Sequence, residues 1–79
     1  MKKVHGYLKY PHLLDPTQFL VVWLFSGYHY AYTFDEIIEK LADRKITLNR
    51  EELEGALYYF IEKDCLSRNP HTGKFFTLD

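Results

Sequence analysis

The sequence is poor in cysteine, and its hydrophobic runs are short. Its single cysteine, Cys65, cannot form an internal disulfide or build a zinc site alone, and it suits a reducing compartment. The longest apolar run, residues 19–25, has seven residues, whereas a membrane-spanning helix needs about 20. No apolar segment follows the basic start Met1-Lys2-Lys3, so the sequence predicts no signal peptide. We therefore expect a soluble, cytoplasmic protein.

Motifs of catalysis and metal binding are also missing. The sequence has no phosphate-binding glycine-rich loop and no serine-hydrolase or zinc-protease motif. No two of its four histidines have the spacing of metal ligands; they are His5, His12, His29 and His71. Cys65 with His71 would supply only two metal ligands, and as a catalytic pair it lacks an orienting third group. We expect no enzyme activity, no metal and no cofactor, and Cys65 is predicted to be a small buried residue.

Aromatic residues, by contrast, are abundant. The 79 residues include seven Tyr, six Phe and one Trp, which make up 18% of the chain. Each aromatic side chain buries about 150–250 Å², so the core of one small domain cannot enclose all of them. Some aromatic side chains are therefore expected on the surface, either at an interface or as ordinary solvated tyrosines.

The net charge of −1 is unevenly distributed along the chain. Residues 1–14 carry Lys2, Lys3 and Lys9 and no acidic residue. Residues 49–64 are acidic, with Glu51, Glu52, Glu54, Glu62 and Asp64 against Arg50 and Lys63. The remaining tail is weakly basic through Arg68 and Lys74. This pattern predicts a basic arm, an acidic helix and a weakly basic hairpin.

The first half of the chain contains one strong helix start. Residues 4–10 are typical of a short strand or an ordered arm, although Gly6 weakens a strand. Asp15 as N-cap, Pro16 at the first helical position and Gln18 at the capping-box position then predict a helix to about Ser26, stopped by Gly27. Its centre is apolar all the way round, so we expect it to be buried in its own domain or against a partner.

The second half predicts a short strand, two amphipathic helices and a hairpin. The strand is expected at residues 28–32. Thr33 with Glu36 forms a capping box for a helix ending near Lys45, whose apolar stripe is Phe34, Ile37, Ile38 and Leu41. Asn49 with Glu52 opens a third helix, ending near Asp64, whose stripe is Leu53, Ala56, Leu57, Phe60 and Ile61. Strands at residues 66–69 and 74–78 around a turn at residues 70–73 complete the prediction.

This order of elements, over residues 15–79, resembles the winged helix-turn-helix family. The segment 60–68 is similar to the junction between the family's third helix and its wing, where many members carry a left-handed glycine in place of Cys65. The resemblance implies a small α+β fold of three helices, a C-terminal β-hairpin wing and a short strand before the second helix. Residues 1–14 would form an N-terminal arm or extra strand outside this winged-helix domain.

The resemblance implies a DNA-binding regulator of transcription, whose third helix enters the major groove by its N-terminal half. The outward face of this helix carries Glu51, Glu54 and Glu62, however, and carboxylates are poor neighbours for phosphates. We therefore expect the hairpin and the arm to make the phosphate contacts. The first helix and the aromatic arm would form the interface of a homodimer. The candidate DNA contacts are Asn49, Arg50, Arg68, His71, Lys74, Lys2, Lys3 and Lys9.

The alternative hypothesis is a protein–protein interaction module of the same fold. An acidic third helix that displays tyrosine would suit a basic protein partner, and Gly55 would let a partner backbone approach closely. The candidate interface residues are Glu51, Glu54, Gly55, Tyr58 and Tyr59. Both hypotheses use one fold, because fold alone does not determine function.

Overall fold

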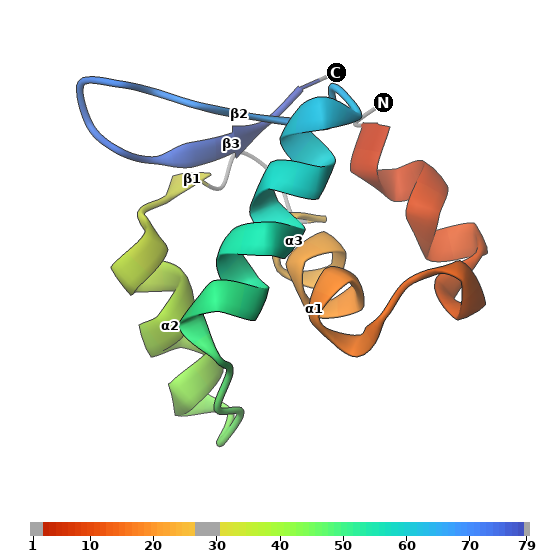
Figure 1. Cartoon of the computed structure of the whole chain (residues 1–79), viewed down its shortest axis with the longest axis horizontal. Coiled ribbons are helices and arrows are strands. Elements are labelled where there is room, and N and C mark those ends of the chain that lie inside the picture. Colours follow the sequence, from red (N-terminus) through yellow and green to blue (C-terminus); the bar gives the residue numbers. More distant parts are fainter. Residues whose placement is uncertain (1–2, 27–30, 79) are drawn as a thin grey trace.

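The computed structural model describes residues 3–26 and 31–78. The described residues form two short 3₁₀-helices, three α-helices and three strands, and Figure 1 shows how they are arranged. In chain order they are η1 (Lys3–Lys9), η2 (Pro11–Leu13), α1 (Pro16–Phe25), β1 (Ala31–Tyr32), α2 (Phe34–Asp43), α3 (Arg50–Glu62), β2 (Leu66–Arg68) and β3 (Phe75–Thr77). Gly27 and most of the predicted strand at residues 28–32 lie outside the described residues.

Polar side chains set the start of each α-helix, as predicted. Both capping boxes are present: Asp15 with Gln18 at α1, and Thr33 with Glu36 at α2. At α3 the Asn49 side chain accepts hydrogen bonds from the backbone N–H groups of the second and third helical residues, at 2.8 and 3.4 Å. Such caps satisfy donors that a helix leaves unpaired, and each contributes about 1 kcal/mol.

The ends of α2 and α3 share one geometry, in which a non-glycine residue adopts the left-handed conformation. These residues are Lys45, with φ of 62°, and Asp64, with φ of 58°. After α3 the backbone N–H of Cys65 donates to the Phe60 carbonyl at 2.9 Å, and the Asp64 N–H donates to the Ile61 carbonyl at 3.1 Å. This is the Schellman pattern. The left-handed residue of the turn is thus Asp64 and not Cys65, whose buried position is as predicted.

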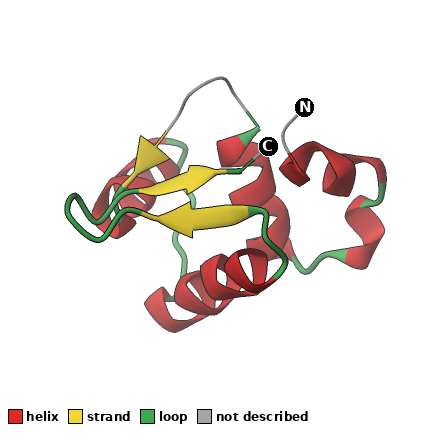
Figure 2. Ribbon diagram, turned by 90° about the horizontal axis from the view of Figure 1, so that it is seen from above, coloured by secondary structure: helices red, strands yellow, loops and turns green. Residues whose placement is uncertain are grey.

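The three strands form one antiparallel sheet in the order β1-β3-β2, which lies across one end of the helices (Figure 2). Ala31 of β1 pairs with Phe76 of β3, and Ser67 of β2 pairs with the same residue from the other side. The predicted hairpin is therefore confirmed. Its turn is closed by the Asn69 side chain, which accepts from the His71 N–H at 2.8 Å, and by Gly73 at φ of 74°.

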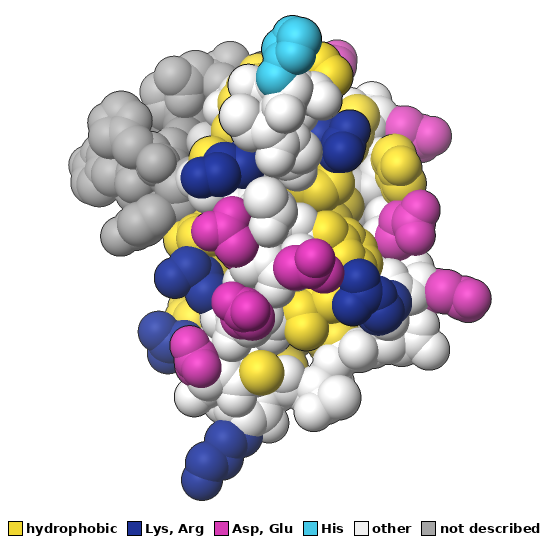
Figure 3. All heavy atoms as spheres, turned by 90° about the vertical axis from the view of Figure 1, so that its left-hand side faces the viewer, with side chains coloured by type: hydrophobic (Ala, Val, Ile, Leu, Met, Phe, Trp, Pro, Cys, Tyr) yellow, Lys and Arg dark blue, Asp and Glu magenta, His cyan; other side chains and the backbone are white. Residues whose placement is uncertain are grey.

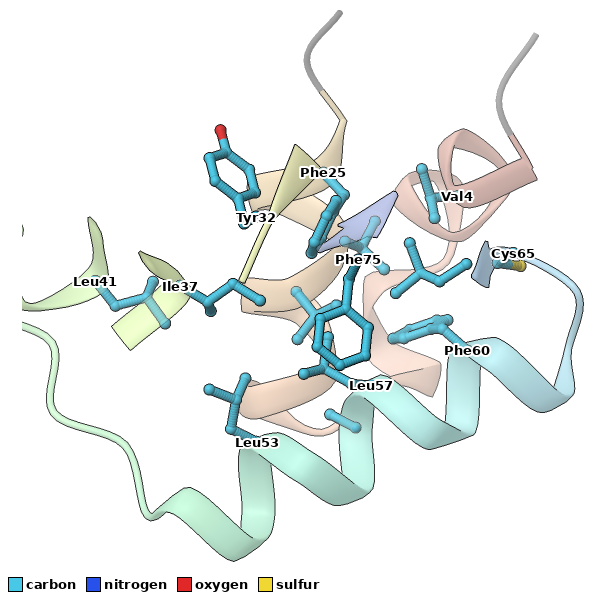
Figure 4. Packing of buried hydrophobic residues seen from close by; sticks show 14 residues of the cluster. Val4, Phe25, Tyr32, Ile37, Leu41, Leu53, Leu57, Phe60, Cys65 and Phe75 are labelled. Carbon is cyan, nitrogen blue, oxygen red and sulfur yellow. The ribbon is translucent and has the colours of Figure 1, made fainter. Parts of the chain in front are cut away.

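The core lies where α1, α2 and α3 meet the sheet (Figure 4). From α3, Leu53, Leu57 and Phe60 point into it, as the apolar stripe predicted. The inward residues of α1 are buried in the same cluster; they are Val21, Val22 and Phe25. One side of the apolar centre of α1 is therefore buried in its own domain, whereas Phe19, Leu20 and Leu24 are half-buried and Trp23 is exposed.

Residues 3–9 form a 3₁₀-helix, so of the two alternatives for residues 4–10 the strand is wrong and the ordered arm is correct. Val4 is fully buried in the core, and the Tyr7 ring meets the Phe60 ring edge-on with centroids 5.2 Å apart. These two residues are three positions apart, the spacing that aligns side chains on a 3₁₀-helix. Burial raises the pKa of the Tyr7 phenol above its ordinary value of 10.0.

The arrangement as a whole is a small α+β fold that agrees with the winged-helix description. Its three α-helices pack together and against a three-stranded antiparallel sheet, with β1 directly ahead of α2 and the β2–β3 hairpin after α3. Within residues 3–26 and 31–78, no helix has the length and apolar character needed to cross a membrane.

Candidate interaction site between the third helix and the hairpin

A groove of about 600 Å³ lies between α3, the start of α2 and the β2–β3 hairpin. We call it the hairpin groove. Its lining comes from all three elements: Thr33, Phe34, Asp35, Arg50, Glu54, Leu57, Tyr58, Arg68, Gly73 and Phe75. The face that holds α2 and the hairpin shows apolar side chains between acidic and basic ones (Figure 3).

The groove has an apolar floor and a charged rim. Leu57 and Phe75 belong to the buried core and only border the floor, whereas Phe34 is half-buried. Tyr58 stands beside them on α3 with 53% of its surface exposed. An aromatic side chain with a polar tip at the edge of an apolar floor is typical of interaction surfaces.

The arginine at the start of α3 is engaged by α2. The Arg50 guanidinium donates to the Asp35 carboxylate at 3.1 Å and lies over the Phe34 ring, 4.9 Å from its centroid. Both charged groups are well exposed, so the pair contributes at most about 1 kcal/mol to stability. Its main effect is to place the Asp35 carboxylate next to Arg50, which the DNA hypothesis expects to contact a phosphate.

The hairpin contributes further cations, and one of them has an acidic neighbour. Arg68 extends along the turn, where its guanidinium lies 3.5 Å from the position that a Cβ atom of Gly73 would take. Lys74 lies near Glu36 and helps to lower the pKa of that carboxyl below its ordinary value of 4.5. The largest cause of this lowered pKa is the hydrogen bond that the carboxylate accepts from the Thr33 N–H, at 2.9 Å.

The groove unites candidates from both sequence hypotheses. Arg50 and Arg68 were predicted to contact DNA, whereas Glu54 and Tyr58 were predicted to contact protein, and all four line the same hollow. Glu51 is exposed on the first turn of α3, outside the lining.

The other candidates lie elsewhere. Asn49 is occupied in capping α3, and Lys9 is at the end of η1, across the molecule from the hairpin turn (Figure 1). Gly55 lines a different groove, and Tyr59 is half-buried with its ring edge-on to Phe60. His71 is exposed in the hairpin turn. Lys2 and the side chain of Lys3 lie outside the described part of the chain.

Six lining residues of the groove were not predicted from the sequence as site residues: Thr33, Phe34, Asp35, Leu57, Gly73 and Phe75. Phe34 and Leu57 belong to the apolar stripes of their helices, and Phe75 belongs to a strand. The sequence therefore predicts them as core residues and gives no sign that they also line a groove. Asp35 sits in the first turn of α2, where an acidic residue is ordinarily explained by the helix dipole. Its contact with Arg50, 15 residues later, depends on how α2 and α3 pack, for which the sequence has no local signal.

Within the described residues, no three His, Cys, Asp or Glu side chains lie close enough together to hold a metal ion. No buried side-chain nitrogen or oxygen in that part of the chain lacks a hydrogen-bond partner. No protein-family model matches the chain, and comparisons with curated proteins and with solved structures found no match.

Proposed function

We propose that the chain is a winged-helix protein-interaction module, whose hairpin groove and acidic α3 face bind a basic segment of a partner protein. One observation carries the proposal: the outward carboxylates of α3 are exposed, while its leading arginine is paired with Asp35. The surface that would enter a DNA groove in a winged-helix regulator therefore presents net negative charge.

The charge balance of α3 supports a basic partner. The Arg50–Asp35 pair is the one salt bridge among residues 3–26 and 31–78, so Glu51, Glu54 and Glu62 are not neutralised by such a pair there. Exposed carboxylates steer oppositely charged partners toward a site and orient them there. Phosphates would be repelled by the same three groups.

The apolar part of the site supports a partner that also carries an apolar anchor. The exposed Tyr58 and the half-buried Phe34 both line the groove, with Leu57 and Phe75 at its border, so an apolar side chain bound there would cover apolar surface of both rings. Exposed tyrosines of this kind often dominate binding energy, because they bury a large area at low cost in conformational entropy. We therefore expect partner segments that combine Lys or Arg with at least one large apolar residue.

Random peptides displayed on phage and selected on the purified protein test this proposal. Selected peptides should be rich in Lys or Arg and should carry an apolar residue, and a fluorescent copy should bind in an anisotropy titration. Tyr58→Ala should weaken binding of that peptide by at least about tenfold, because truncating an interface tyrosine commonly costs more than about 1 kcal/mol. Glu54→Gln should weaken it less, and mainly at low salt.

The matched control is Glu39→Gln, which removes the same charge from an exposed position of α2 outside the groove. It should leave peptide affinity unchanged. Peptides of acidic composition, or peptides whose affinity is the same for the wild type and Tyr58→Ala, would contradict the proposed site.

DNA binding by a regulator of transcription is the second candidate, favoured by the hairpin. Residues 66–78 contain Arg68, His71 and Lys74 and no acidic residue, and the turn between β2 and β3, which holds His71, projects from the body (Figure 1). If three phosphates are contacted, affinity should fall roughly fortyfold between 50 and 200 mM salt, from a slope near −0.9 per contact. A labelled mixed-sequence duplex that shows no anisotropy change at about 50 mM salt and micromolar protein would eliminate this candidate.

A further inference from the structure

The arm before α1 exposes three large apolar side chains. Leu8, Tyr10 and Leu13 have 38%, 55% and 71% of their surfaces in solvent. They make up three of the five large hydrophobic residues that the structure shows as exposed within residues 3–26 and 31–78. We call these three residues the arm patch. The segment that carries them is held to the body by Val4 and Tyr7, so the patch is presented on a folded support.

Next to the arm, the start of α1 and one flank of α3 enclose a second hollow of about 480 Å³, which we call the α1 groove. It is lined by Asp15, Pro16, Thr17, Gln18, Glu52, Gly55 and Ala56. Gly55 leaves the α3 side of the groove open, because a Cβ atom there would meet nothing within 4 Å. The α1 groove lies on the opposite flank of α3 from the hairpin groove, and their linings share no residue.

The arm patch and the α1 groove are neighbours with complementary properties. Leu13 precedes Asp15 of the groove by two positions, and η2 leads directly into the start of α1 (Figure 1). The arm carries Lys9 and no acidic residue, whereas Asp15 and Glu52 stand at the groove. An exposed apolar segment that leads along the chain into a hollow can form a self-complementary pair with it, which a two-fold axis joins twice.

We propose that the chain forms a two-fold symmetric dimer, in which the arm patch of each copy docks into the α1 groove of the other. Leu13 fills the space above Gly55 of the partner copy, and Lys9 faces its acidic groove. The interface uses only the first turn of α1 and leaves the buried residues Val21, Val22 and Phe25 in their own core, whereas the dimer expected from the sequence would use the apolar centre of this helix. It also leaves the hairpin groove free, so it does not depend on the proposed function.

Gly55→Gln gives the sharpest test, because stability and assembly should change in opposite directions. Glutamine favours an exposed helix more than glycine does, so the melting temperature of dilute monomer should rise. The new side chain occupies the groove, so the dimer dissociation constant from sedimentation equilibrium should rise at least tenfold. If Gly55 were only a tolerated surface glycine, the melting temperature would rise and the dissociation constant would not change.

Two further variants and one control complete the experiment. Leu13→Asp should raise the dissociation constant roughly a hundredfold, since two-fold symmetry places the change in the interface twice. Lys9→Glu and Glu52→Lys should each weaken the dimer, and their combination should recover most of the affinity. Ala42→Asp, on the exposed side of α2, is the control and should leave the dissociation constant unchanged.

Wild-type protein that stays monomeric up to about millimolar concentration would overturn the proposal. Oligomers that grow beyond the dimer with concentration would overturn its two-fold symmetry, because an open head-to-tail contact behaves in that way. Peptide binding by Leu13→Asp separates this inference from the proposed function: retained peptide affinity with a lost dimer is the expected result.

Discussion

At the scale of single residues, the ends of α2 and α3 are informative because Lys45 and Asp64 occupy left-handed positions without being glycine. A side chain with a Cβ atom pays roughly 1–2 kcal/mol in this conformation, and only Asn and Asp relieve part of it through local hydrogen bonds. At α2 the turn is closed by the Ile46 N–H, which donates to the Leu41 carbonyl at 2.9 Å. Lys45 therefore keeps a strained backbone conformation in the folded protein.

Replacing Lys45 by glycine should stabilise the protein. Relief of the left-handed strain exceeds the extra entropy of glycine in the unfolded chain, so Lys45→Gly should raise the free energy of unfolding by about 0.5–1 kcal/mol. Urea denaturation measures this change. Asp64→Gly should gain less, because Asp tolerates the conformation better. Arg44→Gly, at an ordinary negative φ of −99°, should instead be destabilising, and a loss of stability in Lys45→Gly would contradict the argument.

At the scale of elements, the start of α2 links stability to pH. The Glu36 carboxylate accepts a hydrogen bond from the Thr33 N–H, which lowers its pKa below the ordinary value of 4.5. Because the folded pKa lies below the unfolded one, the stabilisation is present above about pH 4.5 and is lost as the pH falls through the folded pKa. Glutamine can keep the capping-box hydrogen bond without titrating.

Glu36→Gln should therefore lose less stability than the wild type between pH 6 and about pH 3. The comparison uses urea midpoints of both proteins at both pH values, since other carboxylates titrate equally in each and cancel in the difference. Glu39→Gln, one turn along on the exposed face of α2, is the control and should follow the wild type. Equal acid sensitivity of wild type and Glu36→Gln would show that the capping carboxylate does not carry the effect.

The elements differ in how far the sequence could predict them, and the reason is the distance over which each is determined. The three helix starts depend on side chains within three residues of one another, such as Asp15 with Gln18, and all were predicted correctly. The stripe of α3 follows from helical periodicity alone. The 3₁₀-helix η1 was missed because only the packing of Val4 and Tyr7 on a distant core distinguishes it from a strand.

The candidate site was predictable only in part, for the same reason. Glu54 and Tyr58 follow from the outward face of one helix, so they were found. The hairpin groove requires α2, α3 and the hairpin to meet at fixed positions, which no local pattern reports. The Arg50–Asp35 pair is the clearest case: it places a carboxylate beside Arg50, and it forms because the first turns of α2 and α3 lie close together.

At the scale of the whole molecule, the arm belongs to the same folded unit as the three α-helices. The Cα radius of gyration is 11.6 Å, and a compact chain of this length is expected to have about 12 Å. An arm extended away from the body would raise this value. Val4 is buried together with residues of α1, α3 and the sheet, so the core is complete only when η1 is docked.

Val4→Ala should therefore destabilise the entire fold, not the arm alone. Val4 is 0% exposed, so removing two carbon atoms should cost about 1.5–3 kcal/mol from lost burial and the cavity left behind. For a domain of this size that loss lowers the melting temperature by roughly 6–20 °C. Trp23 fluorescence reports on α1 and far-ultraviolet circular dichroism on all helices, and the two transitions should coincide.

Leu8→Ala, on the same 3₁₀-helix but partly in solvent, is the control at dilute concentration and should change stability by less than about 0.5 kcal/mol. An unchanged Trp23 transition in Val4→Ala would mean that η1 folds and unfolds apart from the body, which its place in the core argues against.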